Sequence, residues 1–275
     1  MQTIRFPDGR AVPTLGLGTW MLGEGRAPAQ QEIEALQAGI DLGMTLVDTA
    51  EMYGDGATER LVGHALKGRR DEVFLVSKAY PQNASRTRLP RACEESLRRL
   101  GTDRLDLYLL HWRGGVPLAE TVEAMEALVA AGKIGGWGVS NLDPADMEEL
   151  VAAGGASCQT NQILYNLTRR GPDLDLLPWM AARALPAMAY SPVEQGRLLA
   201  HPGLSTLAEE LDTTPVILAL AWVLEQGLIA IPKASTTAHV AENRKAAALT
   251  IPPEARARLE ALFPPPPAPV PLEMI

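Results

Sequence analysis

Four residues of the sequence carry side chains that together could move a proton: Asp48, Tyr53, Lys78 and His111. A tyrosine hydroxyl has a reference pKa of about 10, too high for efficient proton donation at neutral pH. A lysine ammonium beside the phenol favours the phenolate and lowers that pKa, and a carboxylate beyond the lysine would hold the ammonium in place. A histidine adds a second donor suited to orienting a substrate carbonyl. Brought together, these side chains form an acid–base site.

The elements that must position these residues follow from the chain's alternation of β-rich and helical patterns. Eight runs are predicted strands: 16–19, 45–48, 73–77, 105–111, 136–140, 158–163, 187–190 and 230–232. Helical patterns lie between them, for example 31–42, 59–67, 91–100, 118–131, 145–151, 176–184 and 216–225. Such alternation indicates parallel strands joined by helical crossovers, and eight repeats favour an α/β fold of the (β/α)8 TIM-barrel type.

Active sites of such barrels lie at the C-terminal ends of the strands. Every predicted strand ends in polar or aromatic residues: Thr19 and Trp20, Asp48 with Tyr53 beyond it, Lys78, His111 and Trp112, Ser140 and Asn141, Asn161 and Gln162, Tyr190 and Ser191, and Lys233. Taken singly, Asp48 could cap a loop, Lys78 could be a solvated strand end and His111 could be a hydrogen-bonded core residue. The complete ring favours a functional site.

Other features complete the predicted organisation. No glycine-rich dinucleotide fingerprint follows a strand, since the run at 16–20 lacks its third glycine, which argues against a Rossmann fold. Turn residues at 7–10 between two β-rich runs predict a hairpin within residues 1–14. Residues 264–275 form a Pro-rich tail that we expect to be extended. No linker divides the chain, so we expect one barrel domain over residues 1–275.

Composition limits the partners. Lys and Arg total 25 and Asp and Glu total 33, giving a net charge of −8. We therefore expect no nucleic-acid or membrane partner, because both require a strong positive field. The first ten residues lack a signal-peptide core, and the longest apolar run, 215–224, is far shorter than the ~20 residues that span a bilayer, so we expect a cytoplasmic protein. Cys93 and Cys158 have no metal-ligand spacing; we expect two buried thiols and no metal site.

Several linked motifs resemble those of the aldo-keto reductases, in order and over nearly the whole chain. They are residues 48–54 (DTAEMYG), 75–78 (LVSK), 106–112 (DLYLLHW), 138–141 (GVSN), 160–162 (TNQ), 189–192 (AYSP) and 231–235 (IPKAS). The chain looks most like the bacterial methylglyoxal and aldehyde reductases of that family. The resemblance implies that Tyr53 donates the proton, Lys78 lowers its pKa, Asp48 pairs with Lys78 and His111 orients the carbonyl.

The resemblance also implies that NAD(P)H binds across the barrel mouth without a Rossmann domain. Ser140, Asn141 and Gln162 match residues that bind the carboxamide, and Tyr190 matches the ring that stacks on the nicotinamide. A flat aromatic face and fixed donors suit this group. Further cofactor contacts are expected from Gly18, Thr19, Trp20, Asp48, Ser191, Pro192, Gln195, Gly196, Leu198, Ile231, Pro232 and Ala234.

The adenosine end departs from the family in one position. Lys233, Ser235, Glu242 and Asn243 match positions for the 2′-phosphate, ribose and adenine. The family often has an arginine six residues after the lysine, where this chain has His239, which lacks the planar fork that grips phosphate. We expect NADPH, held by Lys233 with help from Ser235 and His239, with NADH as an alternative.

The substrate pocket is predicted from aromatic and sulfur side chains near the acid–base set: Trp20, Met52, Tyr53, His111 and Trp112. Such a wall suits small or aromatic aldehydes. Trp179 is a further candidate, although ordinary helix packing explains it better. Because the chain offers little more than its tail beyond the last helical pattern, we expect an open, promiscuous pocket in a monomer.

Two other functions fit the same scaffold. One is a regulatory subunit, like the β subunits of potassium channels, in which cofactor binding matters more than turnover. The other is a Schiff-base aldolase with Lys78 or Lys233 as the nucleophile. Oxidation of NADPH by an aldehyde, or borohydride trapping of a substrate adduct, would discriminate among them.

Overall fold

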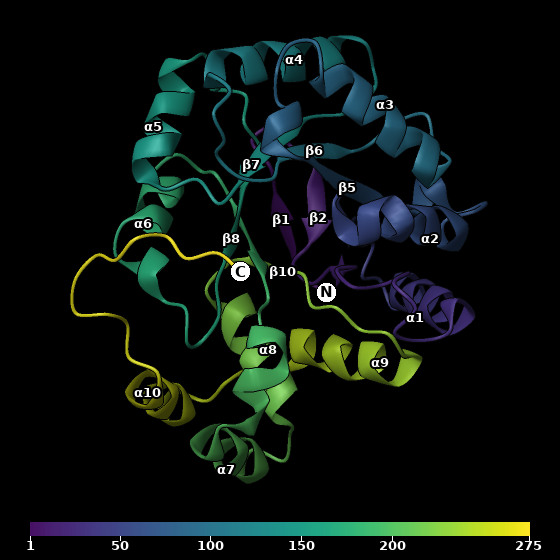
Figure 1. The fold of residues 1–275 in the computed structure, drawn as a ribbon. Coiled ribbons are helices and arrows are strands. Elements are labelled where there is room, and N and C mark those ends of the chain that lie inside the picture. The colour runs from purple at the N-terminus through teal and green to yellow at the C-terminus, as the bar shows by residue number, and fades with distance from the viewer.

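Eight parallel strands form a barrel inside a ring of helices in the computed structural model, which describes residues 1–275 (Figure 1). In sheet order they are β3 (Leu17–Gly18), β4 (Leu46–Asp48), β5 (Phe74–Ala79), β6 (Leu107–Leu110), β7 (Trp137–Ser140), β8 (Asn161–Leu164), β9 (Ala187–Tyr190) and β10 (Ile229–Ala230). Parallel bridges from Leu15 to Ala230 and from Gly18 to Lys233 close the sheet. The predicted (β/α)8 barrel is confirmed.

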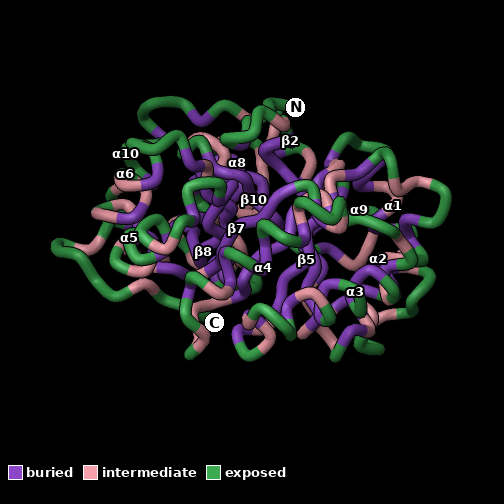
Figure 2. The backbone as a smooth tube through the Cα atoms, turned by 90° about the horizontal axis from the view of Figure 1, so that it is seen from above, coloured by how far each residue is buried: buried purple, intermediate pink, exposed green.

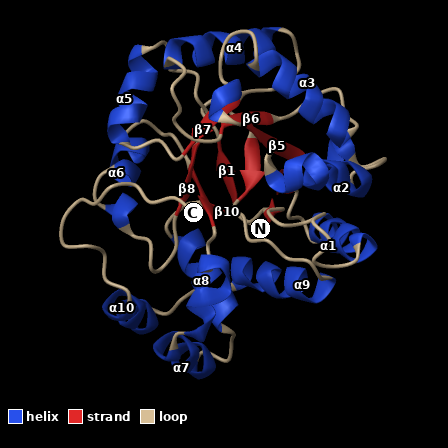
Figure 3. Cartoon of the chain, viewed as in Figure 1, coloured by secondary structure: helices blue, strands red, loops and turns tan.

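The helices cover the outside of the strands (Figure 3). They are α1 (Ala29–Asp41), α2 (Ala57–Ala65), α3 (Leu89–Leu100), α4 (Leu118–Ala130), α5 (Pro144–Ala152), α6 (Leu176–Ala181), α7 (Pro202–Glu210), α8 (Pro215–Glu225), α9 (Thr237–Lys245) and α10 (Pro253–Leu262). The seven predicted helical patterns correspond to α1–α6 and α8. The apolar run 215–224 is α8, whose residues 217–223 are all buried within the protein. No helix is both long and apolar enough to cross a bilayer.

Several helices begin where a capping residue precedes a proline. Asp143, His201 and Thr214 each accept a hydrogen bond from a backbone N–H in the first turn of α5, α7 and α8, and the next residue is proline. The cap satisfies a backbone N–H that has no partner inside the helix. Proline at the first helical position costs no hydrogen bond, because the N–H that it lacks would have no partner there. These sequence pairs therefore fix the start of three crossover helices.

The strands place chemistry at one end of the barrel because side chains alternate between its inside and its outside. Leu46, Val76 and Leu109 belong to a small buried cluster distinct from the main core. Two residues further along the same strands or just past them stand Asp48, Lys78 and His111. The same alternation that buries the apolar residues inside the barrel therefore carries these three polar side chains to its C-terminal mouth.

Two glycines allow close backbone approaches in the barrel wall. A Cβ on Gly18 would lie 2.4 Å from the carbonyl oxygen of Ile231, where β3 meets the chain beyond β10. A Cβ on Gly138 would lie 2.7 Å from the carbonyl oxygen of Thr160 and 2.9 Å from Leu109. Neither position accepts a larger residue without a backbone shift, so both glycines support barrel closure and interior packing.

The predicted hairpin forms from β1 (Thr3–Arg5) and β2 (Ala11–Pro13) and covers the opposite end of the barrel. Phe6 is 2% exposed, joins the interior cluster and stacks on Phe74 with ring centroids 5.4 Å apart. Arg10 donates to the backbone carbonyl of Asp106. Burying a phenylalanine contributes roughly 1.5–3 kcal/mol to stability. The Phe6 side chain therefore holds the hairpin against this end of the barrel.

The C-terminal tail, residues 264–275, is extended as predicted, and it returns to the strand end of the barrel. In Figure 1 the yellow chain leaves α10, runs past α6 and ends near the centre of the ring. Most of the tail is exposed, whereas the strands and the inner faces of the helices are buried (Figure 2).

The two cysteines are buried free thiols, as predicted, and burial raises the pKa of each to about 12.

Candidate active site

Lys78 lies at the centre of a buried chain of polar contacts. Its side chain has no exposure to solvent, and its Nζ donates to Asp48 Oδ2 at 2.7 Å and to the Thr49 carbonyl at 2.9 Å. The third donor direction leads to the Tyr53 hydroxyl at 3.1 Å. All three ammonium protons therefore have partners. The structure brings the predicted carboxylate, ammonium and phenol together.

Tyr53 reaches this position from a tight turn rather than from a strand. It begins the short 3₁₀ segment Tyr53–Gly56 after β4, in which Asp55 has a φ of 51°. The turn directs the phenol back toward Lys78 on the neighbouring strand β5. The half-buried ring also meets His111 edge-on, with centroids 5.8 Å apart.

The pKa of the Tyr53 phenol differs from the value that the sequence predicted. Burial raises the pKa of the Tyr53 phenol, and the Lys78 ammonium lowers it by less, so the pKa lies above its usual value rather than below it. Burial by itself lowers the pKa of Lys78, but the Asp48 charge and the hydrogen bonds raise it above normal. Tyr53 is therefore protonated and Lys78 charged at neutral pH.

His111 is a neutral imidazole in this site. Burial, together with the nearby Lys78 charge, lowers its pKa to about 2. Its side chain is packed against Trp112, and its Nδ1 is buried without a hydrogen-bond partner. This is a perturbed titratable group at a cavity wall, which is a common feature of functional sites.

A cavity of about 780 Å³ opens above these residues. Most of the predicted site residues line it: Gly18, Thr19, Trp20, Asp48, Met52, Tyr53, His111, Trp112, Asn141, Gln162, Tyr190, Ser191, Pro192, Gln195, Gly196, Ile231, Pro232, Lys233, His239, Glu242 and Asn243. The volume lies in the range of small-molecule and cofactor sites. One cavity therefore joins the acid–base set to the predicted adenosine end.

Four predicted cofactor residues do not line this cavity. Ser140 is 1% exposed and its hydroxyl donates to the Gln162 carbonyl, so it faces its neighbours in the barrel wall. Leu198 and Ala234 are buried in the main hydrophobic core. Ser235 is half-buried, and its carbonyl accepts from Gln31. These four residues do not line the cavity, and their contact with the cofactor stays a prediction.

The amide side chains near the acid–base set are held in fixed orientations. Asn141 donates to the His111 carbonyl and to the Ser140 hydroxyl, and its Oδ1 accepts from the Tyr190 hydroxyl at 2.9 Å. Gln162 donates to Asp48 Oδ1 at 2.8 Å. The predicted carboxamide-binding residues are thus joined to each other and to the proton-transfer groups.

The opposite end of the cavity carries cationic and polar groups. Lys233 and His239 are exposed, and His239 lies in the first turn of α9, where Thr236 caps the helix. Glu242 accepts a hydrogen bond from Thr214 at 2.8 Å, which ties α9 to the start of α8. A lysine beside a helix N-terminus suits an anionic group.

Sequence reasoning missed six residues that line the cavity: Met21, Val193, Leu199, Val216, Met274 and Ile275. Met21, Val193 and Leu199 lie beside predicted site residues and could have been found by extending those segments. Met274 and Ile275 come from the tail, so the expected open pocket has a C-terminal contribution to its wall. Trp179 does not line the cavity; it packs against the main core from α6, as the simpler interpretation held.

The charge state of Lys78 argues against an aldolase in which Lys78 is the nucleophile. A Schiff-base lysine attacks as the neutral amine. Lys78 is ion-paired to Asp48, has no exposed surface and has a raised pKa, so the neutral form is disfavoured.

The structure also contains no group of three or more His, Cys, Asp or Glu side chains arranged to hold a metal ion.

Comparison with known proteins agrees with this geometry. The sequence profile of the Aldo/keto reductase family matches residues 14–263. Methylglyoxal reductase YeaE of Escherichia coli (strain K12) is 49% identical over 279 residues, covering 99% of this chain and 98% of that protein.

Two solved structures of an aldo/keto reductase from Klebsiella pneumoniae are each 52% identical to this chain. The structure in complex with NADP and acetate covers 99% of both chains with a TM-score of 0.96. The structure in complex with NADPH covers 100% of this chain and 99% of that chain with a TM-score of 0.97. These matches confirm the resemblance, the enzyme class and the cofactor class predicted from the motifs. The chain belongs to the aldo/keto reductase family.

Proposed function

We propose that this protein reduces small aldehydes and 2-oxoaldehydes to alcohols with NADPH, and that Tyr53 donates the proton. The observation that carries the proposal is the buried Asp48–Lys78–Tyr53 chain at a cavity wall shared with His111. The Escherichia coli relative is a methylglyoxal reductase and the Klebsiella pneumoniae structures hold NADP or NADPH, which supports the substrate and cofactor classes.

Tyr53 has a proton to donate, because its hydroxyl is protonated at neutral pH, but burial makes the loss of that proton unfavourable unless the resulting charge is stabilised. As the proton passes to the carbonyl oxygen, negative charge develops on the phenol oxygen, 3.1 Å from the Lys78 ammonium. A fixed cation in a water-poor site stabilises developing charge far better than bulk water does. Asp48 keeps the ammonium charged and in place. Lys78 therefore assists the transfer by stabilising its product.

His111 supplies a neutral hydrogen-bond donor to the carbonyl. A neutral imidazole carries one N–H. Since Nδ1 is buried without a partner, we assign the proton to Nε2, which then donates to an oxygen near Tyr53. Two donors converging on one oxygen would polarise the carbonyl and fix its position.

The polar groups of the cavity fit a nicotinamide nucleotide, which when bound supplies the hydride that reaches the carbonyl carbon. Asn141 and Gln162 offer amides for the carboxamide, and the Tyr190 ring offers a flat face. We assign Ser140 a supporting role, because its hydroxyl holds Gln162 and Asn141 rather than facing the cavity. Lys233 and the start of α9 would hold the 2′-phosphate, with His239 beside them.

The aromatic wall of the cavity limits the substrate class. Trp20, Met52 and Trp112 are half-buried around the acid–base set, and Tyr80 meets Trp112 edge-on at 5.9 Å. These surfaces suit compact, flat carbonyl compounds rather than large polar ones.

The proposal is tested by following nicotinamide absorbance with a panel of aldehydes that includes methylglyoxal and benzaldehyde, with NADPH and NADH in parallel. We expect turnover with several small aldehydes and preference for NADPH. Nucleotide binding without turnover on any aldehyde would instead favour the regulatory-subunit alternative.

A further inference from the structure

A strained segment follows β9 at the mouth of the barrel. Within residues 191–196, which we call the cofactor loop, Ser191, Glu194 and Gln195 have φ values of 47°, 51° and 56°. L-residues rarely adopt this left-handed region, and three such residues within six positions need surrounding contacts to hold them. Most of this loop lines the cavity.

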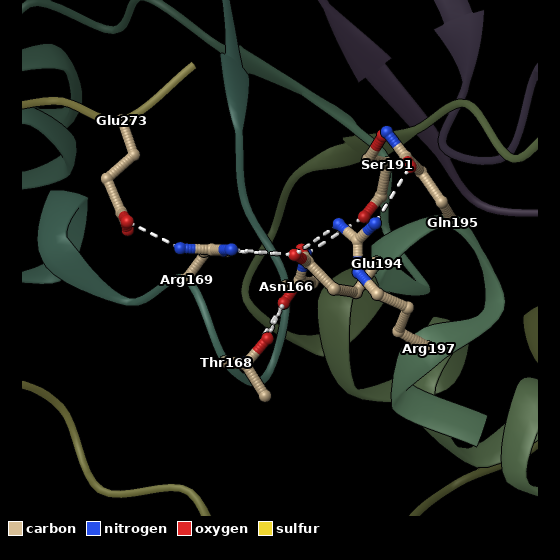
Figure 4. A network of polar contacts seen from close by, with 8 residues as sticks. All are labelled: Asn166, Thr168, Arg169, Ser191, Glu194, Gln195, Arg197 and Glu273. Atoms are coloured by element: carbon tan, nitrogen blue, oxygen red, sulfur yellow. Dashed lines mark hydrogen bonds and ion pairs between the residues drawn. The ribbon is translucent and has the colours of Figure 1, made fainter. Parts of the chain in front are cut away.

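The contacts that hold the cofactor loop converge on Glu194, whose side chain is 7% exposed (Figure 4). Its Oε1 accepts from Arg169 at 2.8 Å and from Arg197 at 2.9 Å. Its Oε2 accepts from Asn166 at 2.8 Å. Asn166, which is fully buried just after β8, also donates to the Ser191 carbonyl at 2.9 Å. The start of the loop at Ser191 and its middle at Glu194 are therefore both fixed to the segment that follows β8.

Arg169 also binds the C-terminal tail. Its guanidinium points toward Glu194 on one side and toward Glu273 on the other, and Nη1 donates to Glu273 Oε1 (Figure 4). Beside Glu273, Leu272 packs against the main core and Met274 and Ile275 line the cavity. We call residues 270–275 the strap.

The strap has few other anchors. Glu273 is 46% exposed on its side chain, Val270, Met274 and Ile275 are exposed apolar residues, and the segment has no regular secondary structure. A chain segment of this kind gains its order from a small number of contacts. A single guanidinium shared with the cofactor loop is therefore well placed to tie the strap's position to the state of that loop.

We propose that Arg169 is a positioning residue that couples the cofactor loop to the strap, so that nucleotide binding and closure of the substrate pocket reinforce each other. The inference rests on the proposed function and on the cofactor contacts that the family resemblance predicts for four residues of this loop, all of which line the cavity: Ser191, Pro192, Gln195 and Gly196. Thermodynamic linkage makes this coupling reciprocal. If bound nucleotide stabilises the ion pair of the strap by some factor, the ion pair must raise the affinity for nucleotide by the same factor.

The first test is a double-mutant cycle on NADPH affinity, measured by fluorescence titration. Glu273→Gln removes the strap's ion pair and should weaken NADPH about 2- to 5-fold, the range for a half-exposed pair. In an Arg169→Met background the same substitution should have no further effect. Arg169→Lys should behave like Arg169→Met in the cycle, because a lysine lacks the fork that reaches two carboxylates.

A matched control is Glu210→Gln, which removes a similarly exposed ion pair between α7 and Arg258 on α10. It should leave NADPH affinity unchanged. Equal effects of Glu273→Gln in the wild-type and Arg169→Met backgrounds, or no effect in the wild type, would overturn the coupling.

The second test reads the strap directly. A protease specific for glutamate cuts after Glu273, and intact-protein mass reports the cut. NADPH should slow this cut in the wild type and should lose that effect in Arg169→Met. Equal protection by NADPH in both proteins would show that the strap senses nucleotide without Arg169, and would overturn the inference. Absence of NADPH binding to the wild type would overturn the proposed function as well, so the two failures are distinguishable.

Discussion

Gln162 donates to one oxygen of Asp48 at 2.8 Å while Lys78 donates to the other at 2.7 Å. A residue that the family resemblance assigns to the nicotinamide thus orients the carboxylate that holds the Lys78 ammonium. Both carboxylate oxygens are satisfied, although Asp48 is 2% exposed. The contact joins the cofactor side of the cavity to its proton-transfer side.

Asp48→Asn should destabilise the protein by roughly 3–5 kcal/mol at pH 7, because it leaves the buried Lys78 charge without a partner. The wild-type pair raises the pKa of Lys78 above its usual 10.5, so its stabilisation is complete below that pH and fades as pH rises through the folded-state value. The difference between the two proteins should shrink only above about pH 10.5. Urea unfolding across this range measures it; Asp8→Asn, at a more exposed pair, is the control.

Tyr53→Phe should reduce turnover by ~10²–10⁴-fold while NADPH affinity stays close to that of the wild type, because only the proton donor is lost. The control is Tyr165→Phe, which removes a phenol hydroxyl bonded to Asp173 away from the cavity. Near-normal turnover of Tyr53→Phe at neutral pH would exclude Tyr53 as the acid.

His111 should produce no titration step in kcat/KM between pH 5 and pH 8. Burial and the Lys78 charge lower its pKa to about 2, so the imidazole stays neutral as pH falls through this range. The measurement is kcat/KM against pH for one aldehyde. A step near pH 6.5 that disappears in His111→Gln would contradict the prediction.

Glu194→Gln should cost roughly 1–3 kcal/mol of stability at pH 7, allowing for the screening of its partly exposed arginines. The hydrogen bonds to Arg169 and Arg197 outweigh burial and lower the pKa of Glu194 from 4.5 to about 2. Its stabilisation is therefore present above about pH 4.5 and is lost as pH falls toward 2. Thermal unfolding at pH 7 and at successively lower pH should show the two proteins converging; a constant difference would exclude this ionisation.

His239→Arg should tighten NADPH about 5- to 30-fold, equivalent to roughly 1–2 kcal/mol, and should change NADH affinity little. The 2′-phosphate is the main difference between the two cofactors, and an arginine adds a bidentate contact beside Lys233. Fluorescence titration of both cofactors checks this. Equal tightening of both would show that position 239 does not face the phosphate.

The eight strands were predictable because short β-rich runs alternate with helical patterns, and three of the four catalytic candidates were predictable because they lie at the ends of such runs. Asp48, Lys78 and His111 continue the inward-facing sides of strands whose apolar residues already mark the barrel. Tyr53 lies in a turn beyond β4, so strand position alone does not place it; its place beside Lys78 was predicted from the chemistry of the two side chains and from the family resemblance.

Two features of the site escaped prediction for a physical reason. The Glu194 contacts join segments far apart in the chain, and no local pattern encodes a meeting of Asn166, Arg169, Arg197 and Glu273. The raised pKa of Tyr53 depends on how far burial outweighs one nearby charge, which requires coordinates.

The packing of Phe6 into one end of the barrel affects how ligands enter and leave the cavity. With that end filled by packed side chains, the cavity exchanges its contents with solvent only at the strand-end mouth. Nucleotide and carbonyl compound must therefore enter and leave through the same opening. The hairpin and the apolar side chains of the strands together make the barrel interior a packed core rather than a channel.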